Sequence, residues 1–316
     1  MRAFVFPGQG AQLVGMGKAL AEAYPTAAAV FEEVDAALGE RLSEIIWSGP
    51  AETLTLTENA QPALMATSMA ALRALSAEGI SIDRAAYVAG HSLGEYTALC
   101  AAGALSLSDA ARLLRRRGQA MQAAVPVGEG AMAAILGLDR GAVQAIASEA
   151  ASGDVCAAAN DNDPAQVVIS GHKHAVERAM DLAKARGAKR ALPLPVSAPF
   201  HCALMQPAAE AMEAALADVP IAVPNVPLVA NVVAEAVSDP DAIRQLLVAQ
   251  VTGVVRWRES VAWMAGQGVE DFLEIGAGKA LSGMIRRIVR EARVANISLP
   301  AEVQAVATAI RGDADV

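Results

Sequence analysis

A glycine-flanked serine between two apolar segments constrains the fold of this chain more than any other feature. Residues 85–89 form an apolar run, residues 90–94 read Gly-His-Ser-Leu-Gly, and residues 96–102 form an amphipathic run. This order predicts a buried strand, a tight turn and a helix, the unit of an α/β fold with a parallel sheet. On such a turn Ser92 would lie at a helix N-terminus, where backbone N–H groups can stabilise an oxyanion. The sequence therefore predicts a covalent nucleophile at Ser92, with an ordinary turn serine as the alternative.

The composition is that of a globular protein. The chain has 316 residues, 54% of them hydrophobic, which predicts a substantial core in one large domain or in a large domain carrying a smaller one. No apolar stretch reaches the roughly 18 residues of a membrane span. Proline and glycine interrupt the N-terminal apolar residues too early for a signal peptide, so we expect a cytoplasmic protein without a membrane partner.

Charge and cysteine content exclude other classes. The formal net charge of −9 at pH 7 argues against nucleic acid as a partner, because binding to a phosphate backbone needs a basic surface. The 3 cysteines have no ligand-like spacing, which argues against a disulfide framework and against a metal site.

The order of predicted elements changes in the middle of the chain. Before residue 127 and after residue 197, helices alternate with buried strands, beginning at residues 3–6 and ending with a strand at 272–276 and a helix at 280–290. The segment between them is predicted to contain strand 132–136, helix 140–151, strands 155–159 and 166–170, helix 174–186 and strand 190–194. This βαββαβ order is typical of the ferredoxin-like arrangement. We therefore predict an α/β protein whose large, α/β-hydrolase-like domain with a mostly parallel sheet (1–126 and 198–316) carries an inserted small ferredoxin-like domain (127–197).

The chain has 4 histidines that could serve as the base for Ser92. His91 adjoins the serine, and because neighbouring side chains diverge it is better placed to line a pocket than to take the proton. His172 and His174 flank a lysine at the start of a predicted surface helix, where a solvated role is favoured. His201 follows the serine in chain order, as the base does in α/β-hydrolase-type enzymes, so we predict it as the base. A histidine buried in the core is the alternative.

Arg117 occupies a position where an apolar residue belongs. In the helix predicted over 108–123, residues spaced by three and four form the stripe Ala110, Leu113, Leu114, Arg117 and Met121. Burying an unpaired guanidinium costs several kcal/mol. Arg117 therefore either has a structural carboxylate partner or faces a cavity that receives an anion, such as a substrate carboxylate held by a bidentate fork.

Motifs along nearly the whole chain resemble those of malonyl-coenzyme A:acyl carrier protein transacylases. They are Phe6-Pro7-Gly8-Gln9-Gly10, Gln61-Pro62-Ala63, Gly90-His91-Ser92-Leu93-Gly94-Glu95, Arg117-Gly118 with Met121-Gln122, Asn160 with the run 166–171, Pro199-Phe200-His201, Gln250 upstream of Arg256-Trp257, and Glu274-Ile275-Gly276. So many blocks in the same order make the resemblance specific.

The resemblance implies a ping-pong acyl transfer. A malonyl group would pass from coenzyme A to Ser92, and then to the phosphopantetheine thiol of an acyl carrier protein. His201 would be the base, and Gln250 would orient His201 through its main-chain carbonyl. The backbone N–H groups of Gln9 and Leu93 would form the oxyanion hole, and Arg117 would pair with the malonyl carboxylate.

The same resemblance supplies expectations for the pocket and the partners. Gln61, His91 and Asn160 would line the pocket, and the aromatic Phe200 would disfavour a branched acyl group. We expect a monomer with no metal and no resident cofactor. Cations that could meet coenzyme A phosphates or an acidic carrier protein are Lys184, Arg186, Lys189, Arg190, Arg286 and Arg287, although most such charges are simply solvated.

Two other functions stay open from the sequence. A serine thioesterase or esterase could use the same nucleophile turn, but the lack of an obvious aspartate for a triad and the position of Arg117 argue against it. A non-catalytic module that docks a carrier protein could keep the fold with a decayed site, but Ser92, His201 and Arg117 are all intact.

Overall fold

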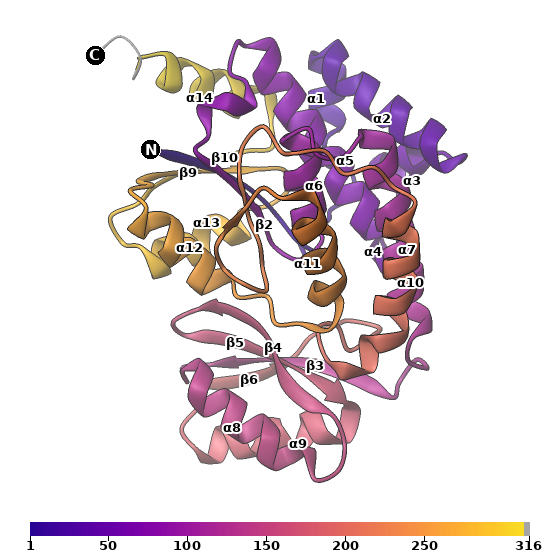
Figure 1. Cartoon of the computed structure of the whole chain (residues 1–316), viewed down its shortest axis with the longest axis vertical. Coiled ribbons are helices and arrows are strands. Elements are labelled where there is room, and N and C mark those ends of the chain that lie inside the picture. Colours follow the sequence, from indigo (N-terminus) through magenta and orange to yellow (C-terminus); the bar gives the residue numbers. More distant parts are fainter. Residues whose placement is uncertain (313–316) are drawn as a thin grey trace.

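The computed structural model describes residues 1–312 and contains two β-sheets, which lie in separate parts of the molecule (Figure 1). Within these residues the large sheet has six strands in the order β10-β9-β1-β2-β7-β8, and the small sheet has four in the order β4-β5-β3-β6. The chain enters the small sheet after α7 and returns to the large sheet after α10. The large sheet is therefore built from two segments, one before the small sheet in the sequence and one after it. The fold is a mixed α/β fold, as the sequence predicts.

The elements have the following bounds. The strands of the large sheet are β1 (Arg2–Phe6), β2 (Tyr87–Gly90), β7 (Leu228–Val229), β8 (Ala236–Val237), β9 (Asp271–Ile275) and β10 (Arg293–Ile297). The strands of the small sheet are β3 (Gly130–Leu136), β4 (Cys156–Asp163), β5 (Gln166–His172) and β6 (Arg190–Pro193). The helices are α1 (Lys18–Ala23), α2 (Pro25–Leu38), α3 (Leu42–Ser48), α4 (Ala51–Thr55), α5 (Thr57–Ala77), α6 (Gly94–Ala101), α7 (Leu107–Ala123), α8 (Arg140–Ala151), α9 (Lys173–Ala185), α10 (Gln206–Ala217), α11 (Pro240–Thr252), α12 (Trp257–Gly266), α13 (Ala280–Ile288) and α14 (Pro300–Gly312), with short 3₁₀ turns η1 (Ile82–Arg84) and η2 (Ala203–Met205).

The large sheet is mostly parallel and covered on both faces. Its strands pair in parallel from β10 to β7, and β8 adds an antiparallel edge. In β1, Phe4 and Phe6 belong to the core cluster that includes α5 and α6, whereas Ala3 and Val5 belong to the cluster that includes Trp257 of α12. Alternate residues of a strand point to opposite faces, so a strand covered on both faces needs the continuous apolar run seen here.

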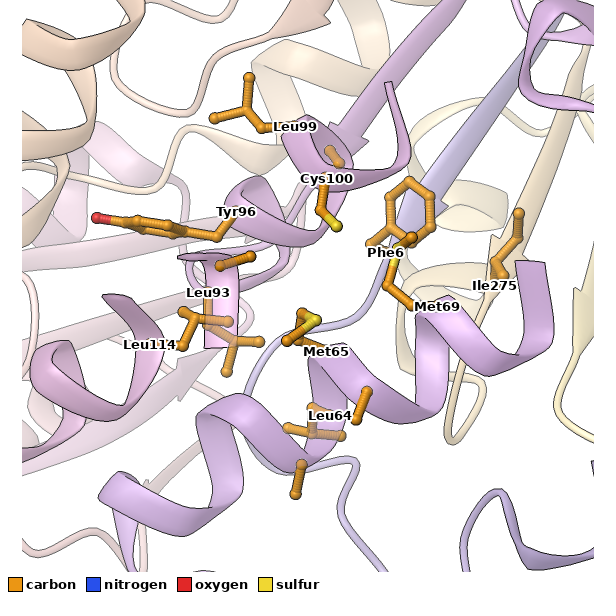
Figure 2. Packing of buried hydrophobic residues seen from close by; sticks show 14 of the residues in the cluster. Phe6, Leu64, Met65, Met69, Leu93, Tyr96, Leu99, Cys100, Leu114 and Ile275 are labelled. Carbon is orange, nitrogen blue, oxygen red and sulfur yellow. The ribbon is translucent and has the colours of Figure 1, made fainter. Parts of the chain in front are cut away.

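The turn that carries Ser92 is supported by a closely packed core. Figure 2 shows side chains from β1, α5, α6 and α7 in one cluster, among them Phe6, Met65, Leu93 and Leu114. All four are no more than 1% exposed. Full burial of such a side chain contributes about 1.5–3 kcal/mol relative to exposure, so the turn has a rigid base.

The small sheet is antiparallel and covered by helices α8 and α9 on one face (Figure 1). Ala133 and Ile135 of β3 pack in the cluster formed with these helices. Met132 and Ala134, which alternate with them, pack instead in the main core. The small sheet therefore turns one face toward the body of the molecule. Its helix α8 has the bounds that the sequence predicts.

Hydrogen bonds and ion pairs connect strand β4 of the small sheet to Val255 and to helices α12 and α13, which pack against the large sheet. Asn160 forms a parallel backbone bridge with Val255, and the Asp161 N–H donates to the Val255 carbonyl at 2.9 Å. The Asp161 carboxylate accepts hydrogen bonds of 2.8–3.0 Å from Arg258 of α12. Asp163 accepts one of 2.8 Å from Arg287 of α13. Both aspartate side chains are 1% exposed, so these ion pairs are largely shielded from water on the carboxylate side.

Candidate active site

Ser92 lies on a sharp turn between β2 and α6. Its φ of 53° is in the left-handed region that residues other than glycine rarely adopt, and such conformations concentrate at functional sites. The flanking glycines allow this turn. A Cβ on Gly90 would lie 1.9 Å from the Gly94 carbonyl carbon, and a Cβ on Gly94 would lie 2.3 Å from the Phe6 oxygen. The glycine-flanked pattern therefore has a steric cause on both sides of the serine.

His201 lies beside the serine, although 109 residues separate them in the chain. Its Nε2 is 2.8 Å from Ser92 Oγ, and its Nδ1 is 2.9 Å from the main-chain carbonyl oxygen of Gln250 in α11. A carbonyl can only accept, so Nδ1 carries the proton of the neutral ring and Nε2 accepts from the serine hydroxyl. His201 is buried, yet its Nε2 faces Ser92, which is the geometry of a base rather than of a core histidine.

The surroundings of His201 keep it neutral. Burial, together with the positive charge of Arg117, lowers the pKa of His201 to about 3, although the hydrogen bond to the Gln250 carbonyl acts in the opposite direction. A neutral imidazole is the form that can take a proton from a nucleophile.

Arg117 of α7 is buried in the same place, at 1% exposure. Its Nη1 donates to Gln61 Oε1 at 2.7 Å, and its Nη2 donates to Gln250 Oε1 at 2.8 Å and to Ser92 Oγ at 3.1 Å. Its Nε has no partner in the described chain, and within residues 1–312 the guanidinium forms no salt bridge. Of the two explanations left open by the sequence, a cavity that receives an anion fits this arrangement. Buried Glu95 interacts electrostatically with Arg117, but in residues 1–312 no carboxylate is in direct contact with the guanidinium.

A set of buried polar groups beneath Ser92 holds these residues in place. Asn231 Oδ1 accepts from the Ser92 N–H at 2.9 Å, and the Asn231 N–H donates to Glu95 Oε2 at 2.9 Å. Gln250 Nε2 donates to the same Glu95 oxygen and to the Ser92 carbonyl, both at 3.0 Å. Burial raises the pKa of Glu95 to about 7. No role for Asn231 or Glu95 was predicted: Glu95 stands inside the serine motif, but Asn231 carries no local signal.

A cavity of about 320 Å³ opens onto Ser92. Its lining includes each of the pocket residues expected from the sequence, namely Gln61, His91, Asn160 and Phe200. It also includes residues that were not expected, namely Met121, Met132, Leu194, Pro195 and Val196. The small sheet and the segment after β6 therefore supply one wall, and the large part supplies the nucleophile.

Two residues of the cavity lining have backbone N–H groups that form no hydrogen bond within residues 1–312. They are Gln9 and Leu93. In residues 1–312 neither backbone N–H donates a hydrogen bond to another group of the chain. Buried N–H groups are nearly always paired, so two unpaired donors beside a nucleophile are what an oxyanion hole requires.

The other expected site residues lie away from Ser92 Oγ. His91 Nε2 is 2.8 Å from Asn162 Oδ1, and burial lowers the pKa of His91. Lys189 and Arg190 are exposed at the start of β6 and do not line the cavity. Arg286 donates to the Val294 carbonyl, and Arg287 is the partner of Asp163 described above. Lys184 and Arg186 form ion pairs with Asp181 and Glu149, and none of the six expected cations lines the cavity.

Two general features complete the description of residues 1–312. No group of three or more His, Cys, Asp or Glu side chains in this part is placed to hold a metal ion. No helix among the same residues combines the length and apolar character needed to cross a membrane.

Comparison with known proteins decides the family. The model of the acyl transferase domain matches residues 3–314. The chain belongs to the acyl transferase domain family. This acyl transferase is 49% identical over 303 residues to the malonyl CoA-acyl carrier protein transacylase of Escherichia coli K12, which covers 96% of this chain and 97% of the relative.

Solved structures agree with this assignment. The acyl-carrier-protein-S-malonyltransferase from Bartonella henselae superposes on this acyl transferase with a TM-score of 0.96 at 55% identity, covering 98% of this chain and 99% of that one. A solved structure described as a type II PKS acyl-carrier protein in complex with its malonyl-transacylase gives a TM-score of 0.94 at 44% identity. The match covers 97% of this chain and 99% of that one. The similarity thus spans both sheets.

Proposed function

We propose that this acyl transferase moves a malonyl group from coenzyme A to the phosphopantetheine thiol of an acyl carrier protein. One observation carries the proposal: a buried guanidinium without a carboxylate partner, Arg117, lies within hydrogen-bonding distance of a serine that is paired with a histidine. The pocket thus offers a nucleophile and a site for an acyl carboxylate a few ångströms apart. The names of the relatives support malonyl as the acyl group and a carrier protein as the acceptor.

In the first step, Ser92 is acylated. His201 Nε2 takes the hydroxyl proton as Oγ attacks the thioester carbonyl. The N–H groups of Gln9 and Leu93 stabilise the tetrahedral oxyanion, and loss of one such donor costs about 10²–10³ in kcat in comparable sites. The carbon–sulfur bond then breaks, and the leaving thiolate of coenzyme A receives the proton from His201. The product of this step is a malonyl ester on Ser92.

In the second step, the carrier protein accepts the group. His201 takes the proton of the phosphopantetheine thiol, and the sulfur attacks the ester carbonyl in the same oxyanion hole. The ester bond breaks, and His201 returns the proton to Ser92 Oγ. The two substrates therefore use one site in turn, which is ping-pong kinetics.

Arg117 supplies the selection for malonyl. In the free protein its Nη2 donates to Ser92 Oγ, the atom that becomes the ester oxygen, so this contact is exchanged for one to the substrate carboxylate. Pairing also affects the base. The charge of Arg117 lowers the pKa of His201, and a bound carboxylate offsets that charge, so a malonyl substrate makes His201 a stronger base than an acetyl substrate does.

The domain organisation forms part of the same proposal. We infer an α/β-hydrolase-like domain over 1–126 and 198–316, whose last four residues lie outside the described part, and a ferredoxin-like domain over 127–197. The strand order β4-β5-β3-β6 with α8 and α9 on one face supports the second assignment. The thioester arm would enter between the two. Lys189, Arg190, Arg286 and Arg287 remain proposed contacts for the acidic carrier protein. We further propose a cytoplasmic monomer without a resident cofactor.

Intact-mass spectrometry tests the function. The protein is incubated with malonyl-, acetyl- or methylmalonyl-coenzyme A, and its mass is measured before and after addition of the phosphopantetheinylated carrier protein, with Ser92→Ala as the control. We expect one malonyl group on Ser92 that moves to the carrier. If Ser92 loses its malonyl group to water without the carrier as fast as it does with the carrier, the protein is the alternative, a serine thioesterase. No mass change on Ser92 would contradict both.

A further inference from the structure

Three consecutive hydrogen bonds connect Arg117 to the loop that holds Gln9. Arg117 Nη1 donates to Gln61 Oε1 at 2.7 Å, and Gln61 Nε2 donates to Thr57 Oγ1 at 3.0 Å. The Thr57 hydroxyl then donates to Gln9 Oε1 at 2.9 Å. Thr57 and Gln61 are each 1% exposed, and of the two only Gln61 lines the cavity. Arg117, the proposed carboxylate ligand, is thereby joined to Gln9, whose backbone N–H is a proposed donor to the oxyanion.

The direction of each bond follows from Arg117. A guanidinium has only donors, so Gln61 must turn its amide oxygen toward Arg117 and its NH₂ group away. That NH₂ group donates to the Thr57 oxygen and, more weakly, to Met121 Sδ at 3.7 Å. The hydroxyl proton of Thr57 is then available for Gln9. Only a group that accepts and donates at once can occupy this position, and a hydroxyl does both.

The first turn of α5 holds Thr57 rigidly. Pro62 has no N–H to bond the Glu58 carbonyl one turn earlier, and Arg115 of α7 donates to that carbonyl instead, at 2.8 Å. The two helices also approach closely at Gly118, where a Cβ would lie 2.5 Å from the Glu58 Cα. The hydroxyl of Thr57 therefore has little freedom to move away from its two partners.

We propose that Thr57 is a positioning residue that determines acyl selection; this inference rests on the proposed malonyl transfer. Its hydroxyl fixes the amide of Gln61 with the oxygen on Arg117. Without the hydroxyl, the buried NH₂ group of Gln61 keeps only Met121 Sδ, a weak acceptor 3.7 Å away, and a flip of the amide would place two donors face to face at Arg117. Malonyl transfer depends on the placement of Arg117, whereas acetyl transfer does not. The ratio of the two activities therefore reports on Thr57.

Serine and alanine at position 57 isolate the hydroxyl, because they differ in that group alone. The assay measures kcat/KM for malonyl- and acetyl-coenzyme A with a saturating carrier protein. We expect Thr57→Ser to keep the malonyl-to-acetyl ratio within about twofold of the original protein, and Thr57→Ala to lower it about tenfold, the effect typical of an unsatisfied buried donor. The matched control is Thr67→Ala in the same helix. Thr67 is also 1% exposed, but its hydroxyl donates to the Ala63 carbonyl at 2.9 Å, outside the cavity. This control should leave the ratio unchanged.

Several results would overturn the inference. They are an unchanged ratio in Thr57→Ala, an equal loss for both substrates with a lower melting temperature, or an equal drop of the ratio in Thr67→Ala. If Thr57→Ala does not fold, Thr57→Val keeps the volume and gives the same comparison. Failure of both to fold while Thr57→Ser folds would assign the hydroxyl to the fold alone. Absence of malonyl on Ser92 in the unaltered protein would remove the proposed function itself, whereas a malonyl preference retained by Thr57→Ala would refute only the role of Thr57.

Discussion

Replacement of Arg117 by alanine should reverse the acyl preference rather than simply inactivate the protein. The guanidinium is 1% exposed and makes three hydrogen bonds in the pocket, so its removal leaves a malonyl carboxylate buried without a partner. Breaking a buried charge pair costs about 3–5 kcal/mol, and about 1.4 kcal/mol corresponds to a factor of ten, so kcat/KM for malonyl-coenzyme A should fall about 10²- to 10³-fold or more. An acetyl group carries no charge and meets a wider pocket.

The base also changes in this variant. Since the charge of Arg117 lowers the pKa of His201, its loss makes the imidazole a better proton acceptor, and acetyl transfer should hold steady or rise. The quantity to measure is the ratio of kcat/KM for malonyl- over acetyl-coenzyme A. Arg116→Ala, on the exposed side of the same helix, is the control for helix stability. An unchanged ratio with both rates falling together would show that Arg117 only supports the fold, and Phe200 would be the next residue to test for selectivity.

Four further predictions follow from the site and its packing. Ser92→Ala should form no acyl-enzyme while keeping its melting temperature, and malonylation of the purified variant would refute the nucleophile. His201→Ala should slow acylation of Ser92 about 10²- to 10⁴-fold, the effect of losing a general base, whereas His174→Ala should leave the rate unchanged. A single-turnover assay measures both rates, and equal losses would show that His201 is not the base. Because burial lowers the pKa of His201 to about 3, kcat/KM should stay flat as the pH falls through 6.5, and the acidic limb should move to higher pH for acetyl transfer by Arg117→Ala; a limb near 6.5 in the unaltered protein would contradict this. Gly118→Ala places a Cβ 2.5 Å from a backbone atom of α5, so thermal unfolding should show a loss of about 1–3 kcal/mol, as for other overpacked sites, and an unchanged melting temperature would be inconsistent with that contact.

The sequence predicts elements well where a local pattern is strong. The bounds of α8 and the buried stripe of α7, including Arg117, agree with the structure. The sequence places the last strand at 272–276, however, and the structure adds β10 and α14 beyond it. β10 is an edge strand whose residues are mostly exposed or half-buried, so it has no apolar run to mark it. β7 and β8 have two residues each, too few for any periodicity.

The same distinction applies to the site. The turn around Ser92 could be predicted because its glycines and its neighbouring apolar runs are adjacent in the chain. Asn231 could not, since its bond to the Ser92 N–H joins residues 139 positions apart and depends on how the elements pack. Thr57 also carries no signal in isolation, because its function comes from the two amides that reach it. Hydrogen bonds between distant elements are the part of this site that only the structure reveals.

The origin of the pocket walls has an evolutionary consequence. The residues proposed to carry the reaction all lie outside residues 127–197: Ser92 as nucleophile, His201 as base, and Gln250 and Arg117 as the groups that orient the base and bind the carboxylate. Residues 127–197 contribute to the cavity wall through Met132, Asn160, Leu194, Pro195 and Val196. Substitutions in that one stretch can therefore alter which acyl chains fit, while the reactive groups stay untouched. Because Arg117 and Phe200 lie outside residues 127–197, exchange of this stretch between homologues would change the shape of one cavity wall and leave the proposed carboxylate site in place. Such an exchange must preserve the backbone bridge between Asn160 and Val255.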